Sequence, residues 1–230
     1  DEVLTVDISD GSVVHRFPLG ASTGSSPALS EGAIVIGDVD NQVVGLDVTD
    51  GSKLWSHDLG PMLEGVFRVA DGVVATPAIV DGVVYVGSVN GRMAALDLSD
   101  GTVVWESSLD GPVYSSAAVA DAVFVTTAAG TAYALDPETG TEIWETPLGD
   151  ASYASPLLAT DLAVVTSEAG IVFGLDPVDG AIMWQVSIGA KGDYMASTPT
   201  LVSGLVVAGS NTGRVVGLGD AGPVSSTEGG

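Results

Sequence analysis

Asp38, Asp40 and Asn41 are the one local group of oxygen-bearing side chains in the sequence with the alternation of a metal-binding loop. Carboxylate and amide oxygens are the ligands that calcium and magnesium prefer in proteins. A calcium loop also needs a glutamate at a fixed distance, and no glutamate follows at that distance here. The pattern therefore favours an acidic hairpin turn. We expect no resident metal or cofactor, and a calcium or magnesium ion at the surface is the one alternative left open.

A second group of aspartates recurs at a regular place along the chain. The stretches "GLDVTDGSKLW", "ALDLSDGTVVW", "ALDPETGTEIW" and "GLDPVDGAIMW" share an aspartate, a glycine and a tryptophan. An aspartate before such a glycine usually accepts hydrogen bonds from the backbone of its own turn. Because the pattern recurs in each copy, these positions are predicted to be structural: Asp47, Asp97, Asp136 and Asp176; Gly51, Gly101, Gly140 and Gly180; Trp55, Trp105, Trp144 and Trp184.

The segments between these copies indicate what positions them. Short valine-rich runs are separated by Glu-Gly, Asp-Gly, Asn-Gly or Thr-Gly pairs, which is typical of strands joined by tight hairpin turns. In the third copy the pattern predicts strands near 115–120, 122–127, 131–135 and 141–147. We find no helical periodicity. Four strands in a unit of about 40 residues predict an all-β fold, a β-propeller of four-stranded antiparallel blades.

The repeat Ala/Gly-Leu-Asp-x-x-Thr/Asp-Gly-x-x-x-Trp resembles the quinoprotein-type (PQQ-like) β-propeller repeat over nearly all of residues 1–218. The non-catalytic branch that it is most similar to contains the propeller lipoprotein of the outer-membrane barrel-assembly machinery. The resemblance implies that each tryptophan docks against the adjacent blade. A weaker copy, "TVDISDGSVVH", has His15 at the tryptophan position, so this contact is in doubt at the start of the chain.

The order of the repeats predicts five blades, the last of them composite. Residues 198–218 would supply its inner strands and residues 12–18 its outer strand, with residues 3–8 and 214–218 competing for the third position. Such closure removes exposed sheet edges. The propeller would span residues 1–218, and the small polar residues 219–230 would form a flexible tail or linker. The alternative is a piece of a larger ring or of a longer chain.

The net charge of the chain limits the kinds of partner that it can bind. The net charge is −24, from 30 acidic and 6 basic residues, while 46% of the residues are hydrophobic. Such a surface repels nucleic acid and anionic membranes, and the apolar content excludes a disordered acidic chain. No apolar run is long enough for a transmembrane helix, which needs about 18 residues or more, so we expect no direct membrane insertion.

The excess of aspartate and the near absence of lysine resemble proteins of haloarchaea. Concentrated salt screens the repulsion among surface carboxylates that would otherwise loosen the fold. We expect the thermal unfolding midpoint to rise between low and molar KCl. A midpoint that stays flat over this range would contradict the expectation.

Catalysis finds little support in the sequence. Quinone enzymes with this repeat resemble one another in holding a calcium ion with acidic and amide side chains, in a catalytic aspartate and often in a vicinal cysteine pair. This chain has no cysteine, and its residues do not match those calcium ligands or that base by position. Its two histidines, His15 and His57, lie at no spacing from a serine or metal ligand that indicates a catalytic site. We expect a protein that is not an enzyme.

Two insertions interrupt the repeat where the fold does not need them. The usual connection from the tryptophan position to the next first strand spans 12 residues, but it spans 22 from Trp55 to Pro77 and 15 from Trp184 to Pro199. The first insertion is residues 57–75 and the second is residues 188–197. Aromatic, methionine and arginine side chains favour interfaces, and loops on a rigid scaffold often bind partners. The candidate partner-binding residues are Met62, Phe67, Arg68, Lys191, Tyr194 and Met195.

Three hypotheses follow, and the sequence favours the first. It is a non-enzymatic, extracellular or cell-surface interaction module that binds a protein partner through these loops. The second is a PQQ- and calcium-dependent dehydrogenase, or a degenerate relic of one. The third is a structural repeat domain of a cell-surface or viral assembly. The two insertions have alternatives to partner binding. They could be extra residues without a function, or they could cover the central channel of the propeller.

Overall fold

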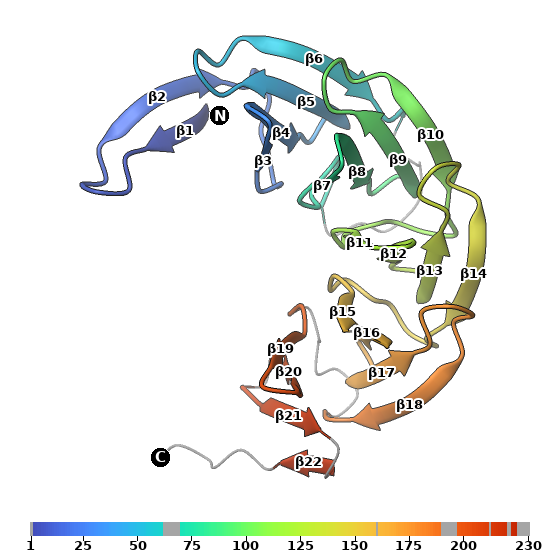
Figure 1. Ribbon diagram of the computed structural model, residues 1–230. Coiled ribbons are helices and arrows are strands. Elements are labelled where there is room, and N and C mark those ends of the chain that lie inside the picture. Colours follow the sequence, from blue (N-terminus) through green and yellow to red (C-terminus); the bar gives the residue numbers. More distant parts are fainter. Residues whose placement is uncertain are drawn as a thin grey trace. The chain divides into compact units, whose positions relative to one another are not determined.

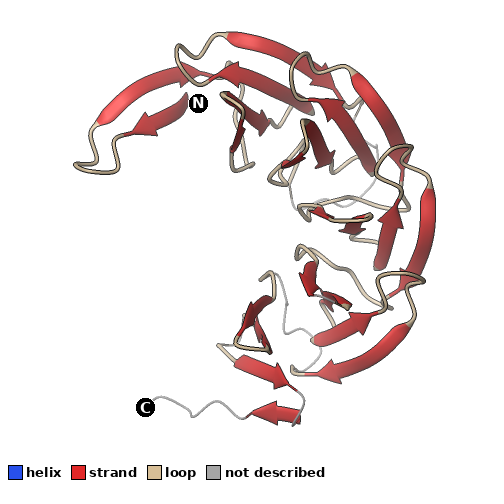
Figure 2. Ribbon diagram, in the orientation of Figure 1, coloured by secondary structure: helices blue, strands red, loops and turns tan. Residues whose placement is uncertain are grey.

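The chain folds into strands joined by turns and loops (Figures 1 and 2). The computed structural model describes residues 2–61, 70–159, 161–189, 197–211, 213–219 and 222–224. Within these residues there are five four-stranded antiparallel sheets and one two-stranded sheet. No helix long and apolar enough to cross a membrane is found in them. The chain divides into two compact units, Asp1–Ser108 and Leu109–Gly230.

The first unit holds the two-stranded sheet and two complete sheets. Within each complete sheet the strands pair in chain order. The strands are β1 (Glu2–Val6) and β2 (Val13–Pro18); β3 (Ala28–Ser30), β4 (Ala33–Gly37), β5 (Gln42–Asp47) and β6 (Lys53–Asp58); β7 (Ala78–Val80), β8 (Val83–Gly87), β9 (Arg92–Asp97) and β10 (Val103–Ser108).

The second unit holds three complete sheets with the same order of pairing. The strands are β11 (Ala118–Val119), β12 (Val123–Thr126), β13 (Thr131–Leu135) and β14 (Glu142–Pro147); β15 (Leu157–Ala159), β16 (Leu162–Ser167), β17 (Ile171–Leu175) and β18 (Ile182–Ser187); β19 (Thr200–Val202), β20 (Leu205–Gly209), β21 (Val215–Gly219) and β22 (Gly222–Val224). Of the four strands predicted for the third repeat, β13 has the predicted bounds and the bounds of the other three differ from the prediction by at most three residues.

Tight turns join the first and second strands, as the dipeptide pairs predicted. Glu31 and Gly32 have φ of 48° and 83°, and Asp81 and Gly82 have φ of 49° and 76°. Two successive residues with positive φ match the turn whose twist suits antiparallel strands. The glycine at the second position adopts this conformation without steric cost.

The recurring aspartates organise the turn between the third and fourth strands. In the third repeat Asp136 Oδ1 accepts hydrogen bonds from the backbone N–H of Glu138 and Thr139, at 3.0 and 2.8 Å. The turn ends at Gly140, whose φ is 68° and whose N–H donates to the backbone carbonyl of Asp136 at 2.8 Å. These residues therefore shape the chain, as predicted.

The same turn makes a pH dependence testable. Hydrogen bonds from the Thr139 side chain and backbone lower the pKa of Asp136 below its ordinary value of 3.8. A lowered pKa contributes stability above the unfolded-state pKa and loses it as pH falls through the folded-state pKa. We expect Asp136→Asn to be less stable than the wild type at pH 6, with the gap closing as the pH falls below the ordinary aspartate pKa of 3.8 and through the lowered pKa of Asp136. Denaturant melts at a series of pH values would measure this, and a constant gap would contradict it.

Tryptophan side chains join neighbouring sheets within each unit. Trp55 is 6% exposed, and its Nε1–H donates to the Leu98 carbonyl of the next sheet at 2.8 Å. A Cβ on Gly101 of that sheet would lie 2.6 Å from the Trp55 ring. Trp144 repeats the arrangement in the second unit, where its Nε1–H donates to the Pro177 carbonyl at 3.0 Å. The docking role implied by the family resemblance is therefore present at these two positions.

Phe17, rather than His15, takes the docking place in the β1–β2 sheet. Phe17 is 2% exposed, and a Cβ on Gly51 of the next sheet would lie 1.8 Å from its ring. His15 stacks on Phe17, with ring centroids 5.6 Å apart. Since alternate residues of a strand lie on one face, Phe17 reaches the same neighbour from two positions further along. The contact that the sequence placed in doubt is thus made by another residue.

The composite closing blade was wrong in its strand pairing. Within the first unit β2 pairs with β1. β21 pairs with β22, so the outer strand of the last sheet is not residues 12–18. The reason is that residues 222–224 supply a fourth strand of their own. The last sheet therefore extends into the segment that the sequence assigned to a tail.

Candidate functional site

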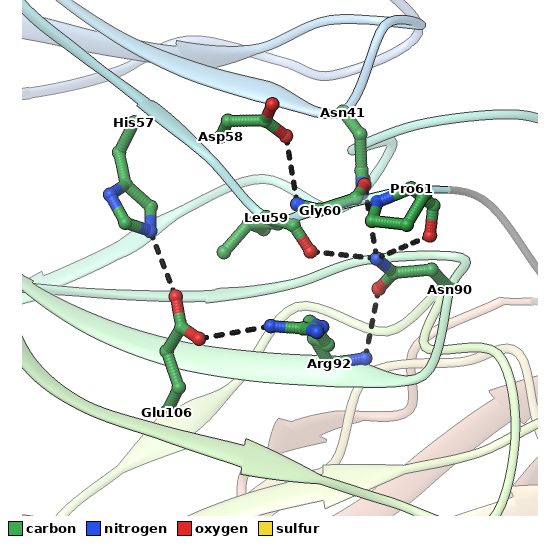
Figure 3. A network of polar contacts seen from close by, with 9 residues as sticks. All are labelled: Asn41, His57, Asp58, Leu59, Gly60, Pro61, Asn90, Arg92 and Glu106. Atoms are coloured by element: carbon green, nitrogen blue, oxygen red, sulfur yellow. Dashed lines mark hydrogen bonds and ion pairs between the residues drawn. The ribbon is translucent and has the colours of Figure 1, made fainter.

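The predicted partner-binding residues Met62, Phe67, Arg68, Lys191, Tyr194 and Met195 lie outside the described residues. Both ends of the first insertion, residues 57–61 and 70–75, are described. They meet the turns between the second and third strands of two adjacent sheets, residues 38–41 and 88–91. The candidate site is this root of the first insertion, which lies wholly within the first unit (Figure 3).

Two asparagine side chains hold the outgoing end of the insertion. Asn90 Nδ2 donates to the carbonyl of Leu59 at 2.8 Å, and it lies 3.4 and 3.3 Å from the carbonyls of Gly60 and Pro61. Asn41 Nδ2 donates to the Gly60 carbonyl from the other side at 2.6 Å. Figure 3 shows the two amides converging on this short segment. Three consecutive carbonyls are thus fixed just before the part of the loop that bears Met62.

The network that orients Asn41 is buried. Asn41 is 1% exposed, and its Oδ1 accepts a hydrogen bond from the Ser88 hydroxyl. The Asn41 carbonyl also accepts from the backbone N–H of Leu59 at 3.0 Å. Buried polar groups that satisfy one another specify a single arrangement. The outgoing end of the insertion therefore has one defined path.

The returning end is fixed by backbone contacts. The Val73 N–H donates to the Asp38 carbonyl at 2.8 Å, and the Val89 N–H donates to the Gly72 carbonyl at 3.1 Å. A Cβ on Gly72 would lie 2.1 Å from the Asp38 carbonyl oxygen, so only glycine allows this approach. The Ser25 hydroxyl donates to the Ala75 carbonyl at 2.9 Å. The insertion therefore leaves and returns at two anchored points.

The carboxylate of Asp38 accepts hydrogen bonds from the backbone of its own turn. Its Oδ1 accepts the backbone N–H groups of Asp40 and Gln42, both at 2.9 Å. Burial raises the pKa of Asp38 despite these two hydrogen bonds. Among the described residues no three His, Cys, Asp or Glu side chains gather closely enough to hold a metal ion. The Asp38 carboxylate therefore helps to shape this hairpin turn, and the absence of a resident metal stays a prediction.

An ion-pair chain borders the root on its outer side. His57 Nε2 lies 2.9 Å from Glu106 Oε1, and Arg92 donates to Glu106 Oε2 at 3.1 Å. The side chains come from the neighbouring sheets, His57 from β6 and the other two from β9 and β10. In a chain with 30 acidic and 6 basic residues, this brings one arginine beside Gly60. The Arg92–Glu106 ion pair is partly exposed, and such pairs contribute little stability, so its main effect is to fix where the positive charge of Arg92 lies.

The described residues at the root of the second insertion make two contacts of the same kind. The Ile188 N–H donates to the Gly170 carbonyl at 2.9 Å, and the Ser197 hydroxyl donates to the Gly209 carbonyl at 2.8 Å. Comparable side-chain clamps occur at a regular connection too, where Thr127 and Thr131 donate to the Asp110 carboxylate at 2.7 and 2.5 Å. What distinguishes the first insertion is the pair of asparagines on three consecutive carbonyls.

Sequence reasoning missed Asn90, Arg92 and Glu106 as parts of this site. Asn90 looks like an ordinary hairpin residue in "SVNGR", and its partners lie about 30 positions away. The sequence held only an indirect indication that Asn90 anchors the insertion. The 22-residue insertion needs anchors at both ends, and turn asparagines at its rim are suitable donors.

Removing the Asn90 amide should loosen the root. We expect Asn90→Ala to leave the carbonyls of Leu59, Gly60 and Pro61 without this donor and to cost about 1–3 kcal/mol, the usual penalty for buried polar groups that lose a partner. Hydrogen exchange should rise in residues 57–61 relative to β12 and β13. Asn211→Ala, at an exposed asparagine, is the control. Unchanged exchange at residues 57–61 in Asn90→Ala would contradict the anchoring role.

Comparisons with known proteins agree on the fold. A family model described as outer membrane protein assembly factor BamB matches residues 1–121 and again residues 110–224. The crystal structure of BamB from Moraxella catarrhalis has a TM-score of 0.76 at 19% identity, covering 90% of this chain and 64% of that chain. A quinohemoprotein alcohol dehydrogenase, ADHIIG from Pseudomonas putida HK5, has a TM-score of 0.70 at 15% identity, covering 90% of this chain and 41% of that one.

The comparisons also set bounds. No curated protein matches the chain in sequence. The chain spans 64% of the length of the BamB structure and 41% of the length of the dehydrogenase. At such identities the likeness shows the fold alone, and the prediction of an all-β propeller with PQQ-like repeats is confirmed.

Proposed function

This chain belongs to the PQQ-like propeller family of the outer membrane protein assembly factor BamB, and from this premise we propose that it is a non-enzymatic scaffold that binds a protein partner. The contact residues would be Met62, Phe67 and Arg68 of the first insertion, with Lys191, Tyr194 and Met195 of the second. The anchored root of the first insertion is the observation that carries the proposal.

The physical argument concerns preorganisation. A loop that binds a partner loses less conformational entropy when its ends are already fixed. Here Asn41 and Asn90 fix the outgoing end, and Asp38 and Gly72 the returning one. A drifted insertion would need no such clamp. The net charge of −24 disfavours acidic partners, whereas Arg68 in the insertion and Arg92 at its root carry positive charge, which favours a partner with mixed polarity.

Membership of a family described as an outer membrane protein assembly factor supports a location outside the cell or at its surface, and we include that location in the proposal. The description of that family as an assembly factor implies binding to other proteins. The anchored root of the first insertion supports the same role for this chain. The third hypothesis, a structural repeat domain without a specific partner, predicts that the insertion can be changed without effect.

The test replaces contact residues and keeps the root. A photo-crosslinking amino acid at Phe67 should give a defined adduct in an extract of the source cells, identified by mass spectrometry. The double variant Phe67→Ala and Arg68→Ala should lose capture of that same protein at an unchanged melting temperature. Val178→Ala, at a position that is 77% exposed in the second unit, is the matched control and should retain capture. Equal capture by the double variant and the control would contradict the proposal.

A separate measurement addresses the enzyme hypothesis. Addition of quinone cofactor and calcium should leave the melting temperature and the absorption spectrum of the cofactor unchanged if the chain is a scaffold only. A ligand that binds only the folded state raises apparent stability by mass action. A saturable rise that needs both quinone and calcium would overturn the non-enzymatic part of the proposal.

A further inference from the structure

The hairpin that joins β11 to β12 is one residue shorter than the hairpin that joins β7 to β8. Ala78 lies opposite Tyr85 in the longer hairpin, and Ala118 lies opposite Phe124 in the shorter one. Tyr85 and Phe124 hold the same place in the repeat, since each ring lies beside the tryptophan ring of its own sheet. Six residues separate the first pair and five separate the second.

The missing residue changes the turn itself. Three hairpins between first and second strands have two successive residues at positive φ: Glu31-Gly32, Asp81-Gly82 and Ser203-Gly204. In the short hairpin Asp121 is followed by Ala122, and neither residue has a positive φ. The Ala120 N–H donates to the Ala122 carbonyl at 3.0 Å instead. The strand pairing therefore stops one pair earlier, and residues 120–122 form a three-residue turn.

A cleft of about 340 Å³ lies beside this short turn, between the β11–β14 sheet and the β15–β18 sheet. Both sheets belong to the second unit. The apolar residues that line the cleft include Ala120, Ala122, Phe124, Ile143, Leu158 and Pro177. Ile143 is 48% exposed and Ala120 is exposed too, so this apolar surface is open to solvent.

The equivalent cleft of the first unit is lined differently. It lies between the β3–β6 and β7–β10 sheets and has a volume of about 280 Å³. Leu54 lines it at the repeat position of Ile143, but its lining also contains polar and acidic residues: Glu31, Asp47, Thr49 and Ser99. The repeat alone therefore does not produce an apolar cleft. A departure from the repeat that the fold does not need is a reason to look for a function.

The charges near the cleft of the second unit determine the sign of a ligand. Asp121 lines the cleft and is exposed, and the exposed Glu142 directly precedes the lining residue Ile143. No lysine or arginine is among the described residues that line it. The basic residues of the second unit are Lys191 and Arg214, and the whole chain has a net charge of −24. This field attracts a cation and repels an anion.

We propose that this cleft binds a small organic cation, a primary amine carried on one aromatic ring or one branched alkyl group. The cleft is at the lower end of the usual range for small-molecule pockets, about 300–1,000 Å³, so it suits a single ring with a short chain. The apolar part would contact Phe124, Ile143 and Leu158, and the ammonium would lie beside Asp121. None of the described lining residues belongs to either insertion, so this ligand is independent of the protein partner proposed above.

The indole of Trp144 can report binding. Its Nε1–H donates to the carbonyl of Pro177, which lines the cleft, and its ring lies 5.9 Å from that of Phe124. In two-dimensional NMR, 2-phenylethylamine should shift the Trp144 indole signal and the residue 120–124 amide signals saturably, with one site. The neutral 2-phenylethanol should bind about two- to fivefold more weakly, the range for an exposed ion pair. The anion 3-phenylpropanoate should bind more weakly still.

Changes in the short turn locate the site. Insertion of a glycine between Asp121 and Ala122 restores the Asp-Gly turn and extends the hairpin over the cleft, so it should weaken amine binding at least about tenfold. Ala120→Leu, at an exposed position, should have the same effect without altering the turn. Asp121→Asn should weaken amine binding about two- to fivefold and leave 2-phenylethanol binding unchanged. Asp81→Asn, in the turn between β7 and β8, is the matched control and should bind as the wild type does.

Melting temperatures verify that each variant folds. A Trp144 indole signal that does not shift saturably with the amine would overturn the proposal. So would binding of 3-phenylpropanoate as tight as that of the amine. Wild-type affinity in Ala120→Leu, or in a folded glycine-insertion variant, would place the amine outside this cleft and would likewise overturn it.

Discussion

Trp144→Ala should lower the free energy of unfolding of the second unit by about 3–5 kcal/mol, the range for deleting a large aromatic side chain from a core. Trp144 is 7% exposed and lies 5.9 Å from the Phe124 ring, between centroids. Its indole also donates to the Pro177 carbonyl, and it fills the space that a Cβ on Gly180 would need. One substitution therefore removes apolar contact, a hydrogen bond and the wedge between two sheets.

Two further variants separate these contributions. Trp144→Phe keeps most of the apolar contact and loses the indole donor, so it should cost about 1 kcal/mol beyond the change in size. Trp184→Ala is the control at the same repeat position. It should cost less than Trp144→Ala because Trp184 is only partly buried. Chemical denaturation followed by tryptophan fluorescence, with hydrogen exchange to assign the change to the second unit, measures all three. A cost of less than about 1 kcal/mol for Trp144→Ala would contradict its role between the two sheets.

The repeat made most of the local fold predictable, because its signals are local. An aspartate that accepts the N–H groups of its own turn, as Asp136 does, and a glycine at positive φ, such as Gly140, depend on neighbours within five residues. Strand alternation likewise needs no information from elsewhere in the chain. The sequence therefore predicted the four-stranded sheets and placed the strands of the third repeat well.

Pairings between distant segments were not predictable in the same way. β1 and residues 214–218 carry equivalent strand patterns, so the sequence left open which of them would pair with β2, and its preferred arrangement was wrong. The docking role of Phe17 was missed because aligning the repeats places His15, and not Phe17, at the tryptophan position. In a strand every second residue lies on the same face, so Phe17 can reach the same neighbouring sheet. The anchored root of the first insertion was not predicted for a related reason. Asn90 contacts Leu59 across 31 positions, and nothing in the hairpin sequence "SVNGR" specifies that contact.

Gly101→Ala should be strongly destabilising in the first unit, by about 2–5 kcal/mol. Two costs combine at this position. Gly101 has φ of 70°, a left-handed conformation that costs a residue with a Cβ about 1–2 kcal/mol. The added Cβ would also lie 2.6 Å from the Trp55 ring, and overpacking of a buried ring costs about 1–3 kcal/mol.

Gly82→Ala provides the control that separates the two costs. Gly82 lies in the same sheet with φ of 76°, but a Cβ there would have no neighbour within 4 Å. It should therefore show the backbone cost alone, about 1–2 kcal/mol. In a Trp55→Ala background the ring is gone, so Gly101→Ala should then cost no more than Gly82→Ala, and the double-mutant cycle should give a coupling of about 1–3 kcal/mol. If Gly101→Ala and Gly82→Ala were equally tolerated in the wild-type background, close docking of Trp55 on this glycine could not be what joins the two sheets. In that case the burial of Trp55 and its bond to Leu98 would have to account for the joint without it.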